Sequence, residues 1–372
     1  MELELVKFLR NGGKPEELTE KYAIKVARHG KFPNLLLFKY NQIDSPMGEQ
    51  IVQESRGIVL DSTDSWRVIC YAYKKFFNRG EGHAAPIDIA TAKIMDKLDG
   101  SIMTIYRYAN DWHVASSGMP DAAGTVNTLL GDMSFAQLFW KTWADLRYSL
   151  PNTKDNRNYS FEMITPYNRI ICVYKQPQIV LHGVRDLDTL QELEPERIAK
   201  QNGWECVKSY KMNSLDDVVA LANTLNPIDN EGFVACDAQF RRVKIKSPQY
   251  VALAHIKEGM SLRRMIEIVR ANESEEYLVH FPEFKALHYE IKGKLDVFAE
   301  EIEETYAAHK DIAVQKDFAL AVCKKPYAGI LFALRKGDFP SVKQALQATH
   351  IDKLAELLGL RDRIRKEASQ NV

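Results

Sequence analysis

The chain has 372 residues, of which 45% are hydrophobic and 27% are charged, so it can bury a sizeable core and we expect two domains, or three if long insertions are present. Its 50 basic and 50 acidic residues cancel, which excludes binding of a polyanion through overall positive charge and leaves only local basic patches. No apolar run approaches the roughly 20 residues of a membrane span, and the N-terminal stretch lacks the layout of a signal peptide. We therefore expect a cytoplasmic protein without a membrane partner.

The cysteines predict neither a disulfide framework nor a zinc site, because they are odd in number, scattered, and free of any C-x-x-C pair. They are Cys70, Cys172, Cys206, Cys236 and Cys323.

Short runs rich in β-branched and aromatic residues fill the chain up to about residue 250 and predict antiparallel sheets. These runs are NLLLFKY, RGIVLD, RVICYAY, SIMTIYRY, WHVASS, IICVY, QIVLHGV and GFVACD. A few helices are expected between them, most clearly over residues 126–149 and 195–203, and the second ends in Asn-Gly as a helix cap would.

Beyond Tyr250 the apolar residues recur at spacings of three and four, which predicts helices. The clearest series is Phe284, Leu287, Ile291, Leu295, Phe298, Ile302 and Tyr306, with Pro282 suited to the first turn. Further helices are expected over 261–272, 314–325 and 341–360, the last starting near Pro340 and Ser341. This change of period predicts an α+β domain of antiparallel sheets with helices over 1–250 and an all-helical domain over 251–372.

The stretch KLDGS, from Lys97 to Ser101, joins two apolar runs and raises two alternatives. Asp-Gly between alternating apolar runs is a strong hairpin signal, in which case Lys97 would merely be solvated. K-x-D-G also arises by chance in roughly one chain in ten of this length, so its surroundings must decide.

Other polar side chains stand in otherwise apolar runs along the same region. They are Arg56 in ESRGIVLD, Lys75 in YKKFFN, Glu162 in SFEMITPYNRII, Glu231 in NEGFVA, and Lys244 with Lys246 in RRVKIKS. The last two are two residues apart, so both point to one face of a strand. Each cluster taken alone is typical of a solvated face.

Taken in order, these clusters resemble the motifs of the covalent nucleotidyltransferase superfamily of ATP-dependent ligases and capping enzymes: KLDGS, FEM, EGFVA and KIKS. Within it, SRGIVL, KKFFN, KLDGS and FEMITPYNRII resemble the bacteriophage RNA ligase 1 family. The resemblance covers essentially the whole chain and is most specific in the first 250 residues. It implies an N-terminal adenylyltransferase domain followed by a helical domain, in place of the β-barrel of DNA ligases.

The residue types suit covalent lysine chemistry. A lysine whose pKa is about 10.4 is a poor nucleophile at neutral pH, so its charge must be disfavoured by burial and by neighbouring cations. Arg56, Lys75, Lys244, Lys246 and a metal would do this for Lys97. The same cations would stabilise the charge that builds up on the phosphates as the P–O bond breaks.

The resemblance implies that Lys97 attacks the α-phosphorus of ATP and forms Lys-AMP, while Lys244 and Lys246 hold the α-phosphate. AMP would then pass to an RNA 5′-phosphate, and a 3′-hydroxyl would displace it. The further roles that it implies are ribose binding by Glu162, metal-bound water at Glu231, a nucleotide pocket that includes Tyr40, Arg56, Lys75 and Phe77, a metal pair at Glu275 and Glu276, and an RNA contact by Tyr250.

Three details of this scheme are open. Mg²⁺, with Mn²⁺ as an alternative, suits isolated glutamates, yet Glu275 and Glu276 would also suit a helix N-terminus. Tyr250 would look the same as a core tyrosine. The family commonly carries a lysine in an S-K-G segment, whereas this chain reads ASSGMP, with Ser117 in its place. A cation of the phosphate pocket is therefore absent or supplied by another segment.

The resemblance further implies repair of a nicked tRNA anticodon stem-loop in partnership with a polynucleotide kinase-phosphatase, in the host cytoplasm if the protein is phage-encoded. The helical domain, with basic residues such as Arg263 and Arg335, would then select the RNA. The alternatives are a DNA ligase, a GTP-dependent capping enzyme, and an RNA-binding module that has lost the chemistry. The first two need a β-barrel after the last motif. The third is disfavoured because the lysines of KLDGS and KIKS are all present.

Overall fold

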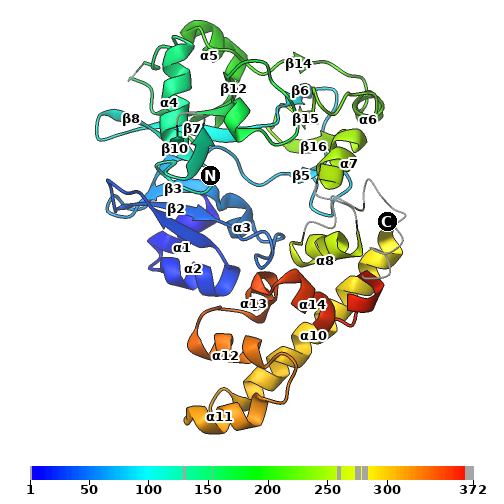
Figure 1. Cartoon of the computed structure of the whole chain (residues 1–372). Helices are drawn as coiled ribbons and strands as arrows, with labels where there is room; N and C mark the ends of the chain where they lie inside the picture. The colour runs from blue at the N-terminus through cyan, green and yellow to red at the C-terminus, as the bar shows by residue number, and fades with distance from the viewer. Residues whose placement is uncertain are drawn as a thin grey trace. The chain divides into compact units, whose positions relative to one another are not determined.

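The computed structural model describes residues 2–128, 131–152, 154–257, 261–272, 278 and 284–364. The chain divides into two compact units (Figure 1), Met1–Asn41 with Ser45–Leu253, and Gln42–Asp44 with Ala254–Val372. The first contains all the described strands, and the second is helical. None of the described helices is long and apolar enough to cross a membrane.

The first unit begins with an antiparallel sheet in the order β1-β2-β3-β4, covered by short helices. The strands are β1 Lys25–Arg28, β2 Leu35–Lys39, β3 Arg56–Asp61 and β4 Arg67–Cys70, and the helices are α1 Glu4–Arg10, α2 Pro15–Tyr22 and α3 Gln50–Glu54. Residues such as Leu5, Phe38 and Ile58 are fully buried between the two layers, as the apolar strand runs predict.

Two further sheets carry the remaining motifs. One has the strand order β13-β12-β11-β7-β8 and the other β14-β6-β15-β16-β5, among the described residues. Their bounds are β5 Phe77–Asn78, β6 Lys93–Lys97, β7 Ser101–Tyr108, β8 Asp111–Ser116, β11 Arg157–Ile164, β12 Gln178–Asp186, β13 Glu192–Leu193, β14 Ser209–Tyr210, β15 Gly232–Cys236 and β16 Arg242–Lys246. The unit also contains helices α5 Pro195–Asn202 and α6 Leu215–Ala222, the turn η1 Pro166–Asn168 and the first part of α7 Pro248–Lys257.

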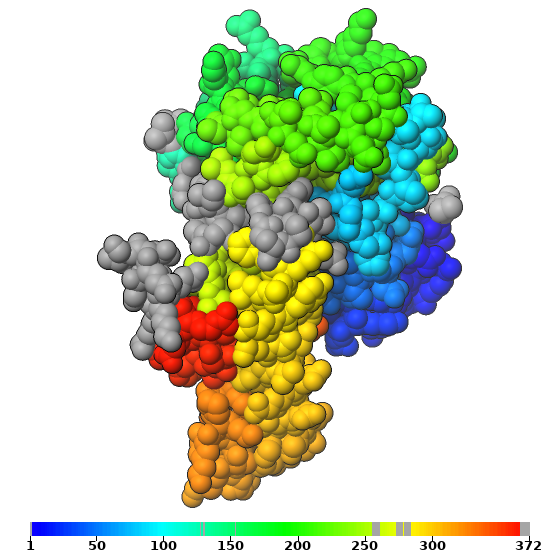
Figure 2. Space-filling model, turned by 90° about the vertical axis from the view of Figure 1, so that its right-hand side faces the viewer, coloured from blue at the N-terminus to red at the C-terminus, as the bar shows by residue number. Residues whose placement is uncertain are grey.

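Segments distant in sequence meet in these sheets. The parallel pairing of β5 with β16 brings the residues near 80 against those near 215, where Arg79 and Asp216 form an ion pair of 2.7 Å. In Figure 2 the same neighbourhood appears as cyan atoms beside green ones on one continuous surface.

The helix predicted over 126–149 is only half correct. The structure has a hairpin of β9 Thr125–Thr128 and β10 Gly131–Ser134, followed by α4 Phe135–Asp145. The side chain of Ser134 accepts from the Gln137 backbone, and Gln137 reaches back to the backbone N–H of Ser134, which is a capping box. The capping box marks the start of the helix at Phe135, whereas the apolar residues before Ser134 wrongly suggested an earlier start.

The strand predicted from IICVY, residues 170–174, is also wrong. The backbone N–H groups of Ile171 and Cys172 donate to the carboxylate of Asp99, at 2.8 and 2.7 Å. Donors engaged by a side chain cannot join a strand ladder, so the segment stays irregular. In contrast, α5 ends before Gly203 in the left-handed conformation, as its sequence predicts.

The helical unit is organised around the long helix α10, Lys285–His309 (Figure 1). Ile291, Phe298 and Ile302 lie on its buried face, which confirms the predicted period, while Pro282 lies outside the described residues. The other helices are α8 Leu262–Arg270, α11 Gln315–Val322, α12 Ala328–Lys336, α13 Val342–Ala348 and α14 Ile351–Leu357. Ser341 caps α13 by accepting from Gln344 N at 3.1 Å, at the predicted start.

Candidate active site

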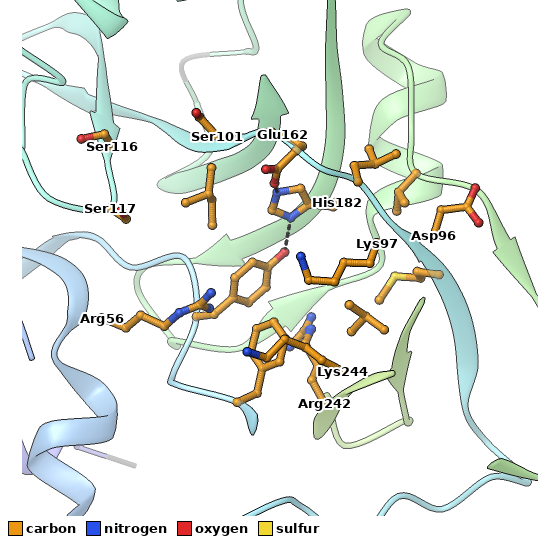
Figure 3. A pocket seen from close by; sticks show the side chains of 18 of the residues that line it. Arg56, Asp96, Lys97, Ser101, Ser116, Ser117, Glu162, His182, Arg242 and Lys244 are labelled. Carbon is orange, nitrogen blue, oxygen red and sulfur yellow. Dashed lines mark hydrogen bonds and ion pairs between the residues drawn. The ribbon is translucent and has the colours of Figure 1, made fainter. Parts of the chain in front are cut away.

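A cavity of about 560 Å³ in the first unit is lined by five of the twelve predicted site residues. Side chains reach it from β2, β3, β6, β11 and β16 (Figure 3). Its wall includes Arg56, Lys97, Glu162, Lys244 and Lys246. Segments almost 200 residues apart in sequence thus converge on one space.

Lys97 lies in an ion-paired group with Glu231 and Lys246. Its Nζ donates to Glu231 Oε2 at 2.6 Å, and Lys246 Nζ lies 3.3 Å from Glu231 Oε1. The carboxylate is only 5% exposed, so it interacts with both ammonium groups with little screening by water. One glutamate therefore holds the candidate nucleophile and a second cation together.

The sheet register explains this grouping. Gly232 pairs with Lys97 on one side and with Lys246 on the other, so the preceding Glu231 lies between the two lysines. Gly232 has φ +147°, and a Cβ there would lie 2.3 Å from Ile245 O. The glycine of EGFVA is therefore required by a close backbone approach.

The hairpin alternative for KLDGS is wrong, because β6 and β7 belong to different sheets. Asp99 is 2% exposed, accepts from Ile171 and Cys172, and also accepts from the Tyr250 hydroxyl at 2.7 Å. A Cβ at Gly100 would lie 2.5 Å from Met163 O. The Asp-Gly pair thus anchors the loop after Lys97 to the rest of the unit and makes no turn between paired strands.

Glu162 faces a histidine that sequence reasoning missed. Oε2 of Glu162 lies 3.5 Å from Nε2 of His182, and the other ring nitrogen of His182 is hydrogen bonded to the Tyr73 hydroxyl at 2.6 Å. Burial raises the pKa of Tyr73, so its hydroxyl keeps its proton. The ring of His182 therefore lies between the Tyr73 hydroxyl and the Glu162 carboxylate (Figure 3).

Gly183 makes room for this contact, since a Cβ there would lie 1.9 Å from the Tyr73 hydroxyl. The His-Gly pair inside the run QIVLHGV is the only trace of the arrangement in the sequence, and by itself it indicates nothing about Tyr73.

Arg56 lies over the ring of Phe76, with its guanidinium carbon 4.7 Å from the ring centre. Its Nη1 is buried and has no hydrogen-bond partner among the described residues. Arg242 also lines the cavity, but its Nη1 donates to Glu192 at 3.0 Å. Arg56 therefore has a buried donor without a partner in the described residues, whereas the guanidinium of Arg242 is bound to Glu192.

Tyr40, Lys75 and Phe77 form a separate cluster. Lys75 Nζ donates to the Tyr40 hydroxyl at 3.2 Å and lies over both aromatic rings. In the described residues, the cavity wall includes Phe76 and not these three. Phe77 points inward because it is a β5 residue paired with Val243, and it is 5% exposed. Phe76, and not the predicted Phe77, therefore lines the cavity.

The remaining predicted residues fall in three places. Tyr250 is 5% exposed and bound to Asp99, which contradicts a direct RNA contact and favours the core reading. Glu275 and Glu276 lie outside the described residues. Ser117 lines the cavity, and its Oγ accepts from Lys39 Nζ at 3.4 Å.

A divalent cation would find one suitable carboxylate here. The described residues contain no group of three or more His, Cys, Asp or Glu side chains that could hold a metal ion by themselves. Mg²⁺ retains most of its waters and takes one or two carboxylates together with substrate phosphates. Glu231, which pairs with the cavity-lining Lys97 and Lys246, would be such a carboxylate.

A protein-family model described as RNA ligase matches residues 54–250, just over half of the chain. The chain belongs to this family. The match begins two residues before Arg56 and ends at Tyr250, so it covers the whole series of motifs from SRGIVL to KIKS. The likeness to bacteriophage RNA ligases read from those motifs is thereby confirmed, and the protein is an RNA ligase.

Two relatives extend the comparison. An RNA ligase of Rhodothermus phage RM378 is 24% identical over 90% of this chain and 92% of its own length. A protein of Autographa californica nuclear polyhedrosis virus, described as a bifunctional polynucleotide kinase/RNA ligase, is 24% identical over 77% of this chain, which spans 42% of that longer protein.

Among solved structures, an archaeal ATP-dependent RNA ligase matches over 90% of this chain and 91% of its own, with a TM-score of 0.48 and 13% identity. A Naegleria gruberi RNA ligase variant with ATP and Mn covers 44% of this chain and 51% of its own, with a TM-score of 0.34 and 17% identity.

Proposed function

We propose that this RNA ligase is ATP-dependent and joins a 5′-phosphate to a 3′-hydroxyl RNA end through a Lys97-AMP intermediate. The observation that supports this most directly is the position of Lys97, whose amine reaches a cavity that also contains Arg56, Lys244 and Lys246. A primary amine beside clustered cations matches what attack on a nucleotide phosphorus requires.

In the first step Lys97 Nζ bonds to the α-phosphorus of ATP, and the bond to pyrophosphate breaks. Lys97 must lose a proton first, and Glu231 accepts its hydrogen bond at 2.6 Å. Lys244 and Lys246 balance the charge on the α-phosphate. A magnesium or manganese ion held at Glu231 would supply further positive charge against the leaving phosphates. The solved structure of the Naegleria enzyme variant contains Mn together with ATP.

In the second step an RNA 5′-phosphate oxygen takes AMP from Lys97. In the third, a 3′-hydroxyl attacks the activated phosphorus, AMP leaves, and a phosphodiester forms. Glu162 would accept from a ribose hydroxyl, and the His182–Tyr73 pair fixes the direction of its carboxylate. All three steps occur at phosphorus, so one cavity serves them.

Intact-mass analysis after incubation with ATP and Mg²⁺ tests this function. Wild type should gain the mass of AMP, and Lys97→Ala should not. Lys97→Arg should be equally inactive because a guanidinium is not deprotonated in proteins. Lys93→Ala is the matched control, since Lys93 is on the same strand but pairs with Glu194 and Glu196 away from the cavity wall.

An adduct that persists in Lys97→Ala would contradict the assignment. A label from GTP in place of ATP would favour the capping-type alternative. No adduct on wild type with either nucleotide would favour the RNA-binding module.

For the substrate, we propose a nicked tRNA anticodon stem-loop whose ends are first healed by a polynucleotide kinase-phosphatase. The support is the family resemblance and the kinase named with the ligase in the baculovirus relative. The helical unit would select this RNA, although several of its basic residues are already engaged: Arg263 pairs with Asp352, and Arg335 donates to Ile312 O.

Truncation near residue 255 tests the selection. The folded truncation should still form Lys-AMP and join plain single strands, but it should repair a nicked stem-loop poorly. Equal losses on both substrates would assign the helical unit to support of the fold or its metal.

A further inference from the structure

One corner of the cavity carries two cations from adjacent strands. Lys39 is the last residue of β2 and pairs across the sheet with Arg56, the first residue of β3, where the register shifts and leaves Gly57 unpaired. Both side chains line the cavity. Directly paired residues project from the same face of a sheet, so their charges lie close together.

Ser117 is held against this corner by the backbone. Gly57 has φ +82°, and a Cβ there would lie 3.0 Å from Ser117 O and 3.3 Å from Ser117 Cα. The turn that carries Ser117 is fixed by Ser116, whose N–H donates to Met119 O at 3.0 Å. The position of Ser117 beside Arg56 is therefore set by close packing and not by its own side chain (Figure 3).

The charge of Lys39 has no carboxylate partner among the described residues. Its one hydrogen bond there is the 3.4 Å contact with the Ser117 hydroxyl, which is neutral. Burial, with Arg56 close by, lowers the pKa of Lys39. The buried Nη1 of Arg56 also lacks a hydrogen-bond partner, so within the described part of the chain this corner holds two cations without an ion-paired carboxylate.

Unpaired, partly buried cations are costly and are usually retained for a ligand of opposite charge. The base and ribose of a nucleotide are neutral, so its anionic part fits this corner. The α-phosphate is placed by Lys97, Lys244 and Lys246 in the proposed function. By elimination, the corner suits the β- and γ-phosphates.

We propose that Lys39 binds the β- and γ-phosphates of ATP together with Arg56, and that Ser117 must remain small because Lys39 occupies the space above it. This inference rests on the proposed function and deepens it. It supplies the cation that the segment ASSGMP lacks at position 117, from a strand 78 residues earlier.

A charge-swap experiment tests the proposal. Lys39→Ser should slow Lys97 adenylation at subsaturating ATP by about tenfold or more, as loss of a charged phosphate contact does. Sealing of a pre-adenylated RNA should stay within about twofold, because that substrate has no β- or γ-phosphate. Ser117→Lys should also slow adenylation, since two ammonium groups would then share one space.

The double variant Lys39→Ser with Ser117→Lys should adenylate faster than either single variant. Lys25→Ala is the matched control, because Lys25 pairs with Lys39 on β1 but is exposed and absent from the cavity wall. Binding of inorganic pyrophosphate, measured by calorimetry, should weaken about tenfold in Lys39→Ser and not in Lys25→Ala.

Wild-type adenylation and pyrophosphate binding in Lys39→Ser would overturn the proposal. Equal losses in adenylation and in sealing would overturn it too, since they would indicate a structural role. If the double variant adenylates more slowly than both single variants, the side chains at positions 39 and 117 do not share one space. These outcomes require that wild type forms the AMP adduct; absence of that adduct overturns the proposed function instead.

Discussion

On one side of the cavity Glu231 lies between Lys97 and Lys246 and neutralises much of their charge, whereas on the other side Lys39 and Arg56 lie together without a carboxylate partner in the described part of the chain. The paired side fixes the position of the proposed nucleophile, Lys97. The unpaired side is ready to attract an anion. One cavity thus separates positioning of the amine from capture of the phosphates.

Glu231→Gln is expected to have the largest effect, because it tests whether the ion pairs of Glu231 with Lys97 and Lys246 matter. The amide cannot balance two ammonium groups, so folding stability should fall by about 3 kcal/mol. Adenylation should fall by about 100-fold or more. Denaturant unfolding and single-turnover adenylation would measure the two effects. Near wild-type values in both would show that the ion pairs are incidental.

Lys244→Ala and Lys246→Ala address the phosphate-binding role of the paired side. Each should slow adenylation, and separately the sealing of pre-adenylated RNA, by about 2 kcal/mol or about 30-fold, because both steps involve the same α-phosphate. Lys93→Ala serves again as the control. Losses confined to adenylation would move these lysines to the β- and γ-phosphates and remove the distinction between the two sides.

Tyr250→Phe should have a smaller effect. It removes the hydrogen bond to Asp99 and should lower the stability of the first unit by about 1 to 2 kcal/mol. Adenylation and sealing should decline together, because the loop behind Lys97 loosens. A selective loss of sealing with unchanged thermal stability would instead restore the RNA contact that the sequence predicted.

Lys39→Met should have the smallest effect on folding stability among these variants, and it should raise stability where the others lower it. Burial lowers the pKa of Lys39, which means that the charged form of this side chain destabilises the folded protein. The substitution should therefore raise stability near pH 7 by about 1 kcal/mol. The gain should shrink as the pH rises toward 10.5, because wild-type Lys39 then sheds its proton. A gain that does not change with pH would exclude charge burial as its cause.

The sequence predicted the elements whose signals are local. The Asn-Gly end of α5 and the three-and-four spacing of α10 were sufficient for their helices. The strand from IICVY failed because Asp99, over 70 residues away, binds its backbone. The helix predicted from residue 126 was wrong at its start, because the spacing of apolar residues does not reveal the β9–β10 hairpin that precedes α4.

The site shows the same limit. Lys97, Glu162, Lys244 and Lys246 could be singled out from the sequence because ordered motifs carry them, and the structure places all four on one cavity wall. His182 and Lys39 were missed because each acquires meaning only from a partner across the fold, Glu162 in one case and Ser117 in the other. The serine at 117 indicated that a family cation was absent, yet nothing local in the sequence pointed to Lys39, whose Nζ contacts the Ser117 hydroxyl.

The contacts of Asp99 also bear on when the enzyme becomes active during synthesis. Its partners lie 72, 73 and 151 residues further along the chain. A ribosome adds about 5 to 20 residues per second, so Tyr250 follows Asp99 by roughly 8 to 30 s. Until then one oxygen of this carboxylate has no donor and the loop behind the nucleophile is unanchored. A nascent chain therefore carries Lys97 for many seconds before the contact of Asp99 with Tyr250 can form and complete the surrounding fold.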